Sequence, residues 1–368
     1  MERVSNYQVL RHWGTLFWSL ILWNILNFFF FYLIYVVFID THKWLGLPRF
    51  DYEFMGEALL TLSFYGGSIL GVFGWLVSVI VSKKFWYNKM PYTLRLLLRM
   101  AITSLLLILI NKGSVMVLKN YHESLYNYID ASNFFYSELF VVYFAFIMMC
   151  SLFMGTLQQL GELLGPIFFK NVIMGKYIHP REEERIFMFL DLSNSTKLAE
   201  ELGHIKYSKL IQRCFADMTD EIVYHRAEVY QYVGDEIVLT WEKKKGLKNN
   251  RCVRLFYDIQ KKFESKKDYY MQNYGVVPSF KAGLNSGLVT GVEVGIVKKE
   301  LAFHGDVLNT ASRLQHVCKE AGECILFTCE FGEELDGVSL RNVGVYHLKG
   351  KSKSSEVCTV DSLNTDVV

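Results

Sequence analysis

The chain has 368 residues, of which 51% are hydrophobic and 15% aromatic, and its formal net charge is only +2. This composition is too apolar for an ordinary soluble protein. Nucleic-acid binding has no support, because the sequence lacks a basic stripe interleaved with aromatic residues. Because the apolar excess lies before residue 160, we expect a membrane half followed by a soluble half.

Four apolar runs lie in the first half, and each is long enough to cross a bilayer about 30 Å thick as a helix of about 20 residues. They cover residues 16–38, 59–81, 94–117 and 139–157. In the third run, Arg95, Arg99 and Lys112 would have to extend toward the lipid head groups. We predict a four-helix transmembrane bundle over residues 1–157; the alternative is a set of buried helices in a large soluble core.

Charges in the connections between these runs predict their orientation. Lys and Arg gather at the N-terminus and between the second and third runs, whereas the other two connections are rich in acidic residues. The positive-inside rule therefore places the N-terminus and everything after the fourth run in the cytoplasm, with the protein spanning a bacterial inner membrane or a plasma membrane. The first run is too long for a signal-peptide core, so we expect it to stay as an anchor in membrane lipid.

Residues 158–182 are predicted to link the two halves. Helical spacing continues past the fourth run until the break at Gly165-Pro166. The charged run at 181–185 favours an exposed boundary just before the first strand of the next domain. The segment has two interpretations, a signalling lever and a passive linker.

The second half alternates strand and helix patterns, which favours an α/β domain with its own core. Strands are expected near 186–190, 229–233, 280–283 and 287–294. A long amphipathic helix is expected to bury one stripe, made of Leu210, Cys214, Met218 and Ile222. None of the seven cysteines has metal-ligand spacing. In a cytoplasmic domain we expect them to be core residues without disulfides.

Two of the expected strands end in an aspartate. Asp191 follows the run 186–190, and Asp235 follows 229–233 at a turn. Such carboxylates can hold hard cations, because Mg²⁺ prefers one or two carboxylates plus phosphate oxygens and water. A pair of ions there would stabilise the attacking and leaving oxygens of an in-line displacement at phosphorus.

Two further groups of polar residues suit phosphate and nucleotide binding. After Asp191, the cap-type residues Ser193, Asn194 and Ser195 precede a helical pattern, whose N-terminus offers free N–H groups to an anion. Asn309 and Arg313 are four residues apart in a helical pattern and share one face. Each motif alone also has a plain interpretation, a turn or a solvated helix face.

Taken together, the segments 189–196, 232–236 and 305–313 resemble the active-site signature of class III nucleotidyl cyclases, in the family's order and roughly its spacing. The resemblance covers about residues 183–360 and leaves a tail at 361–368. It implies a class III cyclase catalytic domain that converts a nucleoside triphosphate, with ATP favoured, into a 3′,5′-cyclic monophosphate and pyrophosphate.

The resemblance also implies roles for particular residues. Asp191, Asp235 and the carbonyl of Leu192 would hold two Mg²⁺ or Mn²⁺ ions per active site. The substrate's phosphates would be bound by the loop residues Ser193, Asn194, Ser195 and Thr196.

The remaining family roles fall on the later motifs. Asn309 would orient the ribose, and Arg313 would neutralise charge on the α-phosphate during the reaction. Lys349 would contact the polyphosphate, with Lys351 as the alternative. In the family, the metal aspartates and the Asn/Arg helix of one site come from different subunits. A chain that carries both sets is therefore expected to form a homodimer with two composite sites.

At the base pocket the chain departs from its family. Adenylate-forming and guanylate-forming members carry characteristic pairs where this sequence has Gln231 and Ala302. A glutamine amide can donate or accept by flipping, so ATP is the preferred substrate while GTP or a pyrimidine triphosphate stays open. The alternative function is a degenerate domain that binds a nucleotide without turnover and acts as a receptor.

Overall fold

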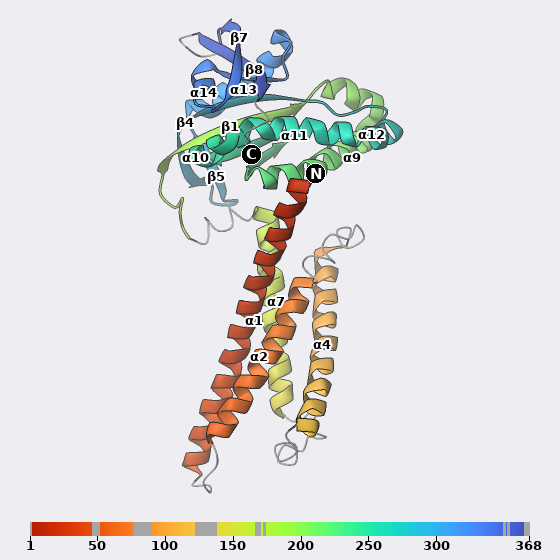
Figure 1. Cartoon of the computed structure of the whole chain (residues 1–368), viewed down its shortest axis with the longest axis vertical. Helices are drawn as coiled ribbons and strands as arrows, with labels where there is room; N and C mark the ends of the chain where they lie inside the picture. Colours follow the sequence, from red (N-terminus) through yellow and green to blue (C-terminus); the bar gives the residue numbers. More distant parts are fainter. Residues whose placement is uncertain are drawn as a thin grey trace. The chain divides into compact units, whose positions relative to one another are not determined.

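The computed structural model describes residues 2–45, 52–76, 90–121, 138–165, 171, 174–348, 351 and 354–363. The chain divides into two compact units, Met1–Leu163 and Leu164–Val368 (Figure 1). The first unit is helical and the second is built on a sheet. The predicted domain bounds at residues 157, 182 and 360 stay predictions.

Four long helices make up the first unit and run alongside one another in Figure 1. They are α1 (Glu2–Trp44), α2 (Tyr52–Leu76), α4 (Tyr92–Tyr121) and α7 (Glu138–Leu164). Each contains a stretch long and apolar enough to cross a membrane: Leu16–Thr41, Leu59–Leu76, Tyr92–Leu109 and Phe140–Gly161. At most 29% of any stretch is buried. Such exposure of apolar side chains does not fit the interior of a soluble core.

Close backbone approach joins α1 to α2. A Cβ atom at Gly67 would lie 2.8 Å from the Cα of Asn24, and one at Gly71 would lie 2.9 Å from the Cα of Leu20. Small residues spaced by four allow such packing between membrane helices. The Tyr143 hydroxyl of α7 donates to Asn27 Oδ1 of α1 at 2.7 Å, so a buried polar pair also joins these two helices.

The second unit contains an eight-stranded mixed sheet of order β2-β3-β1-β4-β6-β8-β7, with β5 paired to β4. The strands are β1 (Arg181–Leu192), β2 (Glu228–Val233), β3 (Glu236–Glu242), β4 (Phe280–Val294), β5 (Glu300–His304), β6 (Ile325–Thr328), β7 (Val338–Tyr346) and β8 (Ser355–Leu363). Neighbouring strands are antiparallel except β4 and β6, which are parallel. The central position of β1 places its carboxyl end beside both β3 and β4.

Helices cover both faces of this sheet. They are α9 (Ser195–Tyr224), α10 (Lys243–Leu247), α11 (Arg251–Ser265), α12 (Lys267–Tyr274), α13 (Asp306–Ala321) and α14 (Cys329–Glu333). One face packs on α9, α11 and α12 through a core that includes Met188, Phe256 and Phe263. The other face packs on α13 through Phe187 and Ala311. The predicted stripe of α9 is buried: Leu210, Cys214, Met218 and Ile222.

Two strands differ from their predicted bounds. β1 begins at Arg181 instead of 186, because residues 181–185 pair with Gly287–Gly291 of β4. The prediction of an exposed charged boundary was wrong at Arg185, which is 1% exposed and donates to Glu183 at 2.7 Å and to Glu228 at 3.0 Å. β4 runs unbroken through Gly287, where two strands were expected.

The cysteines also differ from expectation. Cys329 and Cys358 form a disulfide with a Cα–Cα distance of 4.9 Å. The prediction of no disulfides fails because β6 pairs with β8, and this pairing brings the start of α14 next to Cys358. The other five cysteines are free, and all but Cys324 are buried as expected.

Candidate active site

The two predicted metal aspartates are brought together by strand pairing. Asp191, next to last in β1, lies opposite Glu236 at the start of β3. Asp235 occupies the tight turn between β2 and β3, where Gly234 has a φ of 65° that favours glycine. The turn therefore places Asp235 beside the carboxyl end of the central strand.

The charges at this position repel one another. Burial raises the pKa of Asp191, and the neighbouring Asp235 raises it further. Burial and the charge of Asp191 raise the pKa of Glu236 to about 6. The Oδ2 atom of Asp235 is buried without a hydrogen-bond partner. An excess of negative charge with an unsatisfied carboxylate oxygen fits a divalent cation.

The two carboxylates suit a cation that also binds oxygens of a phosphate ligand. In the part of the chain that the structure describes, no three His, Cys, Asp or Glu residues form a metal-holding group. Two carboxylates leave most coordination positions to other oxygens, which is typical of Mg²⁺ at phosphate sites. Leu192, the third predicted metal ligand, ends β1 with its side chain buried.

The predicted phosphate loop turns sharply between β1 and α9. Asn194 has a left-handed φ of 57° and, as the residue before α9, makes no side-chain cap, so the expected capping by this residue is absent. Ser195 is the first helical residue instead, and Thr196 follows it exposed. The Ser193 Oγ atom is buried without a hydrogen-bond partner. The loop thus keeps a hydroxyl and the first N–H groups of α9 available to an anion.

Two residues that the sequence analysis missed contact the aspartates. Gln315 of α13 donates from Nε2 to Asp191 Oδ2 at 3.2 Å. The Tyr207 hydroxyl of α9 interacts with Ser195 and Asp235, and burial, followed by the charge of Asp235, raises the pKa of Tyr207 to about 12. The available signal for Gln315 was a polar residue on the apolar stripe of α13, four residues after Ala311.

Asn309 and Arg313 lie on α13 as predicted but are not joined to the aspartates of their own chain. Asn309 is exposed and Arg313 half-buried. Among the residues that the structure describes, neither side chain takes part in a hydrogen bond or an ion pair. Both are therefore available to a group outside the described chain.

The predicted base residues lie on two strands that are not neighbours in the sheet, since β2 pairs with β3 and β5 pairs with β4. Gln231 is exposed on the edge strand β2, and Ala302 is half-buried on β5. The residues beside them are in contact, because the backbone N–H of Phe303 donates to the Tyr230 hydroxyl at 3.2 Å. This contact joins the residues next to Gln231 and Ala302, and the base-binding role of these two positions stays a prediction.

Of the two candidate phosphate lysines, Lys351 is among the described residues. Lys349 lies outside the described residues. Lys351 forms an ion pair with Asp306 at the start of α13, with a nitrogen–oxygen distance of 2.9 Å. Its ammonium already has a partner, so Lys349 stays the preferred prediction.

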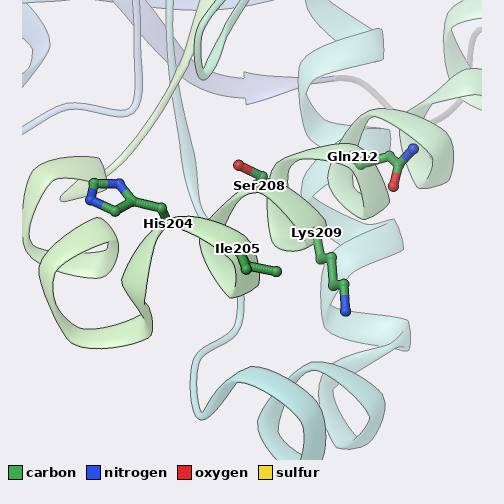
Figure 2. A pocket seen from close by; sticks show the side chains of 5 residues that line it. All are labelled: His204, Ile205, Ser208, Lys209 and Gln212. Carbon is green, nitrogen blue, oxygen red and sulfur yellow. The ribbon is translucent and has the colours of Figure 1, made fainter.

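A surface pocket lies elsewhere on α9, after its kink at Gly203. His204, Ile205, Ser208, Lys209 and Gln212 line it, and Figure 2 shows their side chains spread along the outside of the helix. It contains none of the predicted site residues, and Ile205 there is 76% exposed. We assign it no part in the candidate site.

Comparisons with known proteins agree with the resemblance. Residues 178–360 match the family described as the adenylate and guanylate cyclase catalytic domain. Adenylate cyclase 2 of Rhizobium meliloti (strain 1021) is 31% identical over 213 residues, which are 56% of this chain and 59% of that protein. The match therefore spans less than two thirds of that relative.

Solved structures of similar chains include two adenylyl cyclases. A bacterial light-regulated adenylyl cyclase is 22% identical, with a TM-score of 0.44, and the match covers 49% of this chain and 91% of that one. The adenylyl cyclase CyaB from P. aeruginosa is 20% identical, with a TM-score of 0.46, and the match covers 52% of this chain and 100% of that one.

Proposed function

Since residues 178–360 belong to the adenylate and guanylate cyclase catalytic domain family, we propose that this chain is a membrane-anchored nucleotidyl cyclase with ATP as its substrate. The ribose 3′-oxygen attacks the α-phosphorus and loses its proton, the bond from that phosphorus to the bridging oxygen breaks, and pyrophosphate leaves. The observation that carries the proposal is the half-buried pair Asp191 and Asp235, with a buried and unsatisfied oxygen on Asp235.

The residues of one chain supply the metal half of the site. Asp191 and Asp235, with the Leu192 carbonyl, would hold two Mg²⁺ or Mn²⁺ ions, which supply charge stabilisation to the attacking and leaving oxygens when bound. Ser193, Asn194, Ser195 and Thr196 bind the phosphates at the start of α9.

A second copy of the chain completes the site. Asn309 and Arg313 have no described partner in their own chain, which supports a homodimer in which they orient the ribose and the α-phosphate across the interface. Lys349, the preferred of the two candidate lysines, contacts the polyphosphate.

The base is bound between β2 and β5. Gln231 carries no negative charge to favour guanine, and its amide can donate to N1 of adenine. Ala302 contributes shape.

The membrane assignment supports this chemistry. In this proposal the four apolar helices anchor the chain in the lipid, and the positive-inside rule favours a cytoplasmic N-terminus and catalytic domain. Nucleoside triphosphates and Mg²⁺ are available on that side.

The test uses purified full-length protein with Mg²⁺ or Mn²⁺. ATP, GTP, CTP and UTP are supplied separately and in competition, and the products are identified by mass. We expect 3′,5′-cyclic AMP and pyrophosphate to dominate. A dominant cyclic GMP or cyclic pyrimidine product would overturn ATP as the substrate but not the cyclase reaction. Nucleotide binding without pyrophosphate release would favour the receptor alternative.

A further inference from the structure

A side chain of α13 holds one of the metal-site carboxylates. The Gln315 amide donates to Asp191 Oδ2 at 3.2 Å, across 124 residues of sequence. Gln315 is only 6% exposed and Asp191 is half-buried, so the hydrogen bond is partly shielded from bulk water. An amide donor that is buried against a carboxylate restricts the orientation of that carboxylate.

Backbone packing sets the position of this amide. A Cβ atom at Gly283 of β4 would lie 2.1 Å from the carbonyl oxygen of Ala311 and 2.3 Å from the backbone nitrogen of Gln315. No side chain fits between β4 and α13 at this point. Gly283 also pairs with Phe189 of β1, two residues before Asp191. The backbone of Gln315 is therefore held directly against the part of the sheet that carries the aspartate.

The same helix presents different residues in different directions. Gln315 is buried against its own chain's Asp191, whereas Asn309 is exposed and Arg313 half-buried. In the proposed homodimer, Asn309 and Arg313 belong to the second copy's site. One rigid helix thus contacts its own chain's metal site and reaches toward the other.

We propose that Gln315 is a positioning residue that orients Asp191 for metal binding, so that α13 serves both active sites of the dimer. This inference rests on the proposed function. The amide donates to Oδ2 of Asp191, and the other carboxylate oxygen would be available to a metal ion. Without the amide, Asp191 loses one restraint, and repulsion between like charges favours an orientation turned away from Asp235.

Direct metal binding tests the first part. Free Mn²⁺ is measured by electron paramagnetic resonance with the full-length protein and the α,β-methylene analogue of ATP. Gln315→Met keeps a similar, unbranched shape and removes the amide. Loss of such an outer partner typically weakens metal affinity by about tenfold or more, and we expect this loss for Gln315→Met. The control, Lys319→Met, changes an exposed residue one turn further along α13 and should bind as wild type.

The outcomes separate the two proposals. Mn²⁺ binding by Gln315→Met within twofold of wild type would overturn the role of Gln315 alone. A wild-type protein that binds neither Mn²⁺ nor the analogue would overturn the proposed function. Thermal unfolding without metal shows whether Gln315→Met has lost its fold; if it has, the milder Gln315→Asn is used to decide.

Complementation tests the second part. At limiting Mn²⁺, Gln315→Met chains mixed with Arg313→Ala chains should recover activity, because one mixed site then has an intact metal half and an intact Arg313. Mixing Gln315→Met with Asp235→Ala should give no recovery, since both changes damage the metal half. Recovery with Asp235→Ala but not with Arg313→Ala would assign Gln315, like the nearby Arg313, to the Asn/Arg half of the site. That result would overturn the proposal.

Discussion

At the residue scale, the proposed metal-site carboxylates Asp191 and Asp235 would favour metal binding at the expense of the stability of the metal-free protein. Asp191 and Asp235 lie side by side, and among the described residues no ion pair joins either one to a cation. Removing one charge therefore relieves repulsion in the metal-free protein. Function and stability are expected to respond in opposite directions here.

The corresponding prediction concerns Asp191→Asn. Turnover should fall by more than about tenfold, because one carboxylate of the metal pair is lost. The melting temperature without metal should stay at or above that of wild type. Mn²⁺ with nucleotide should raise the melting temperature of wild type but not of the variant. Pyrophosphate release within tenfold of wild type would contradict the assignment of Asp191.

A second prediction concerns Glu183, which accepts hydrogen bonds from Tyr177, Arg185 and Lys176 at 2.7, 2.7 and 3.0 Å. Burial alone would raise its pKa, but these hydrogen bonds and the charge of Arg185 lower it from its usual 4.5 to about 2. Between these two values the unfolded chain binds more protons than the folded one. The contribution of Glu183 to stability is therefore complete above about pH 4.5 and is lost as the pH falls toward 2.

Thermal unfolding of Glu183→Gln across this range tests the argument. The variant should be less stable than wild type near neutral pH, and the difference should shrink as the pH falls through the window. The exposed neighbour Glu182 provides the matched control, Glu182→Gln. A difference between Glu183→Gln and wild type that does not change with pH would show that Glu183 does not act through its charge.

Sequence reasoning reached some residues and missed others for a physical reason. Asp191 and Asp235 were predicted because a carboxylate at the end of an apolar run is a local pattern. Gln315 and Arg185 were missed because their roles arise from partners 124 and 43 residues away. Such contacts depend on which strands and helices pack together, and this packing cannot be inferred from any short segment of the sequence.

At the scale of elements, the same distinction holds for strand bounds. The apolar core of β1 was predicted, but its start was not, since residues 181–185 join the strand through backbone pairing with β4, which lies about 100 residues further along the chain. β4 continues through Gly287 because β1 pairs with it on both sides of that residue. Four long apolar helices were predicted where the structure has α1, α2, α4 and α7, because the length and composition of an apolar run can be recognised independently of tertiary packing.

The packing of α13 on β4 gives a prediction at this scale. In Gly283→Ala the new Cβ would meet only backbone atoms of α13, at 2.1 and 2.3 Å, so the helix must move away from the sheet. We expect a loss of about 1–3 kcal/mol in stability and a loss of turnover, since Gln315, Asn309 and Arg313 move together. Gly66→Ala, where the nearest atoms lie at an ordinary 3.5 Å, is the control. An active and fully stable Gly283→Ala protein would show that the position of α13 is not critical.

At the scale of the whole molecule, the proposed composite site would make activity depend on two chains. Asp235→Ala and Arg313→Ala chains should each be inactive alone. Mixed, they form dimers in which one of the two sites has both halves intact, so partial activity should return. Absence of recovery between two well-folded variants, together with an active wild-type monomer, would show that one chain forms a complete site.

If the four apolar helices anchor the chain as proposed, they set how often two catalytic domains meet in the bilayer. Diluting vesicles with buffer leaves the ratio of protein to lipid unchanged, so the specific activity of the full chain should not depend on bulk dilution. A fragment of residues 174–368 keeps Tyr177, which is 1% exposed and whose carbonyl accepts from the N–H of Glu293 at 2.9 Å. This fragment should fold, yet its specific activity should fall on dilution as its dimers separate. Coincident dilution curves would contradict this prediction.

Equal rates for the saturated fragment and the full chain under every lipid condition would leave the four helices as an anchor only. Unequal rates would indicate that the helices bias how the two catalytic domains are placed.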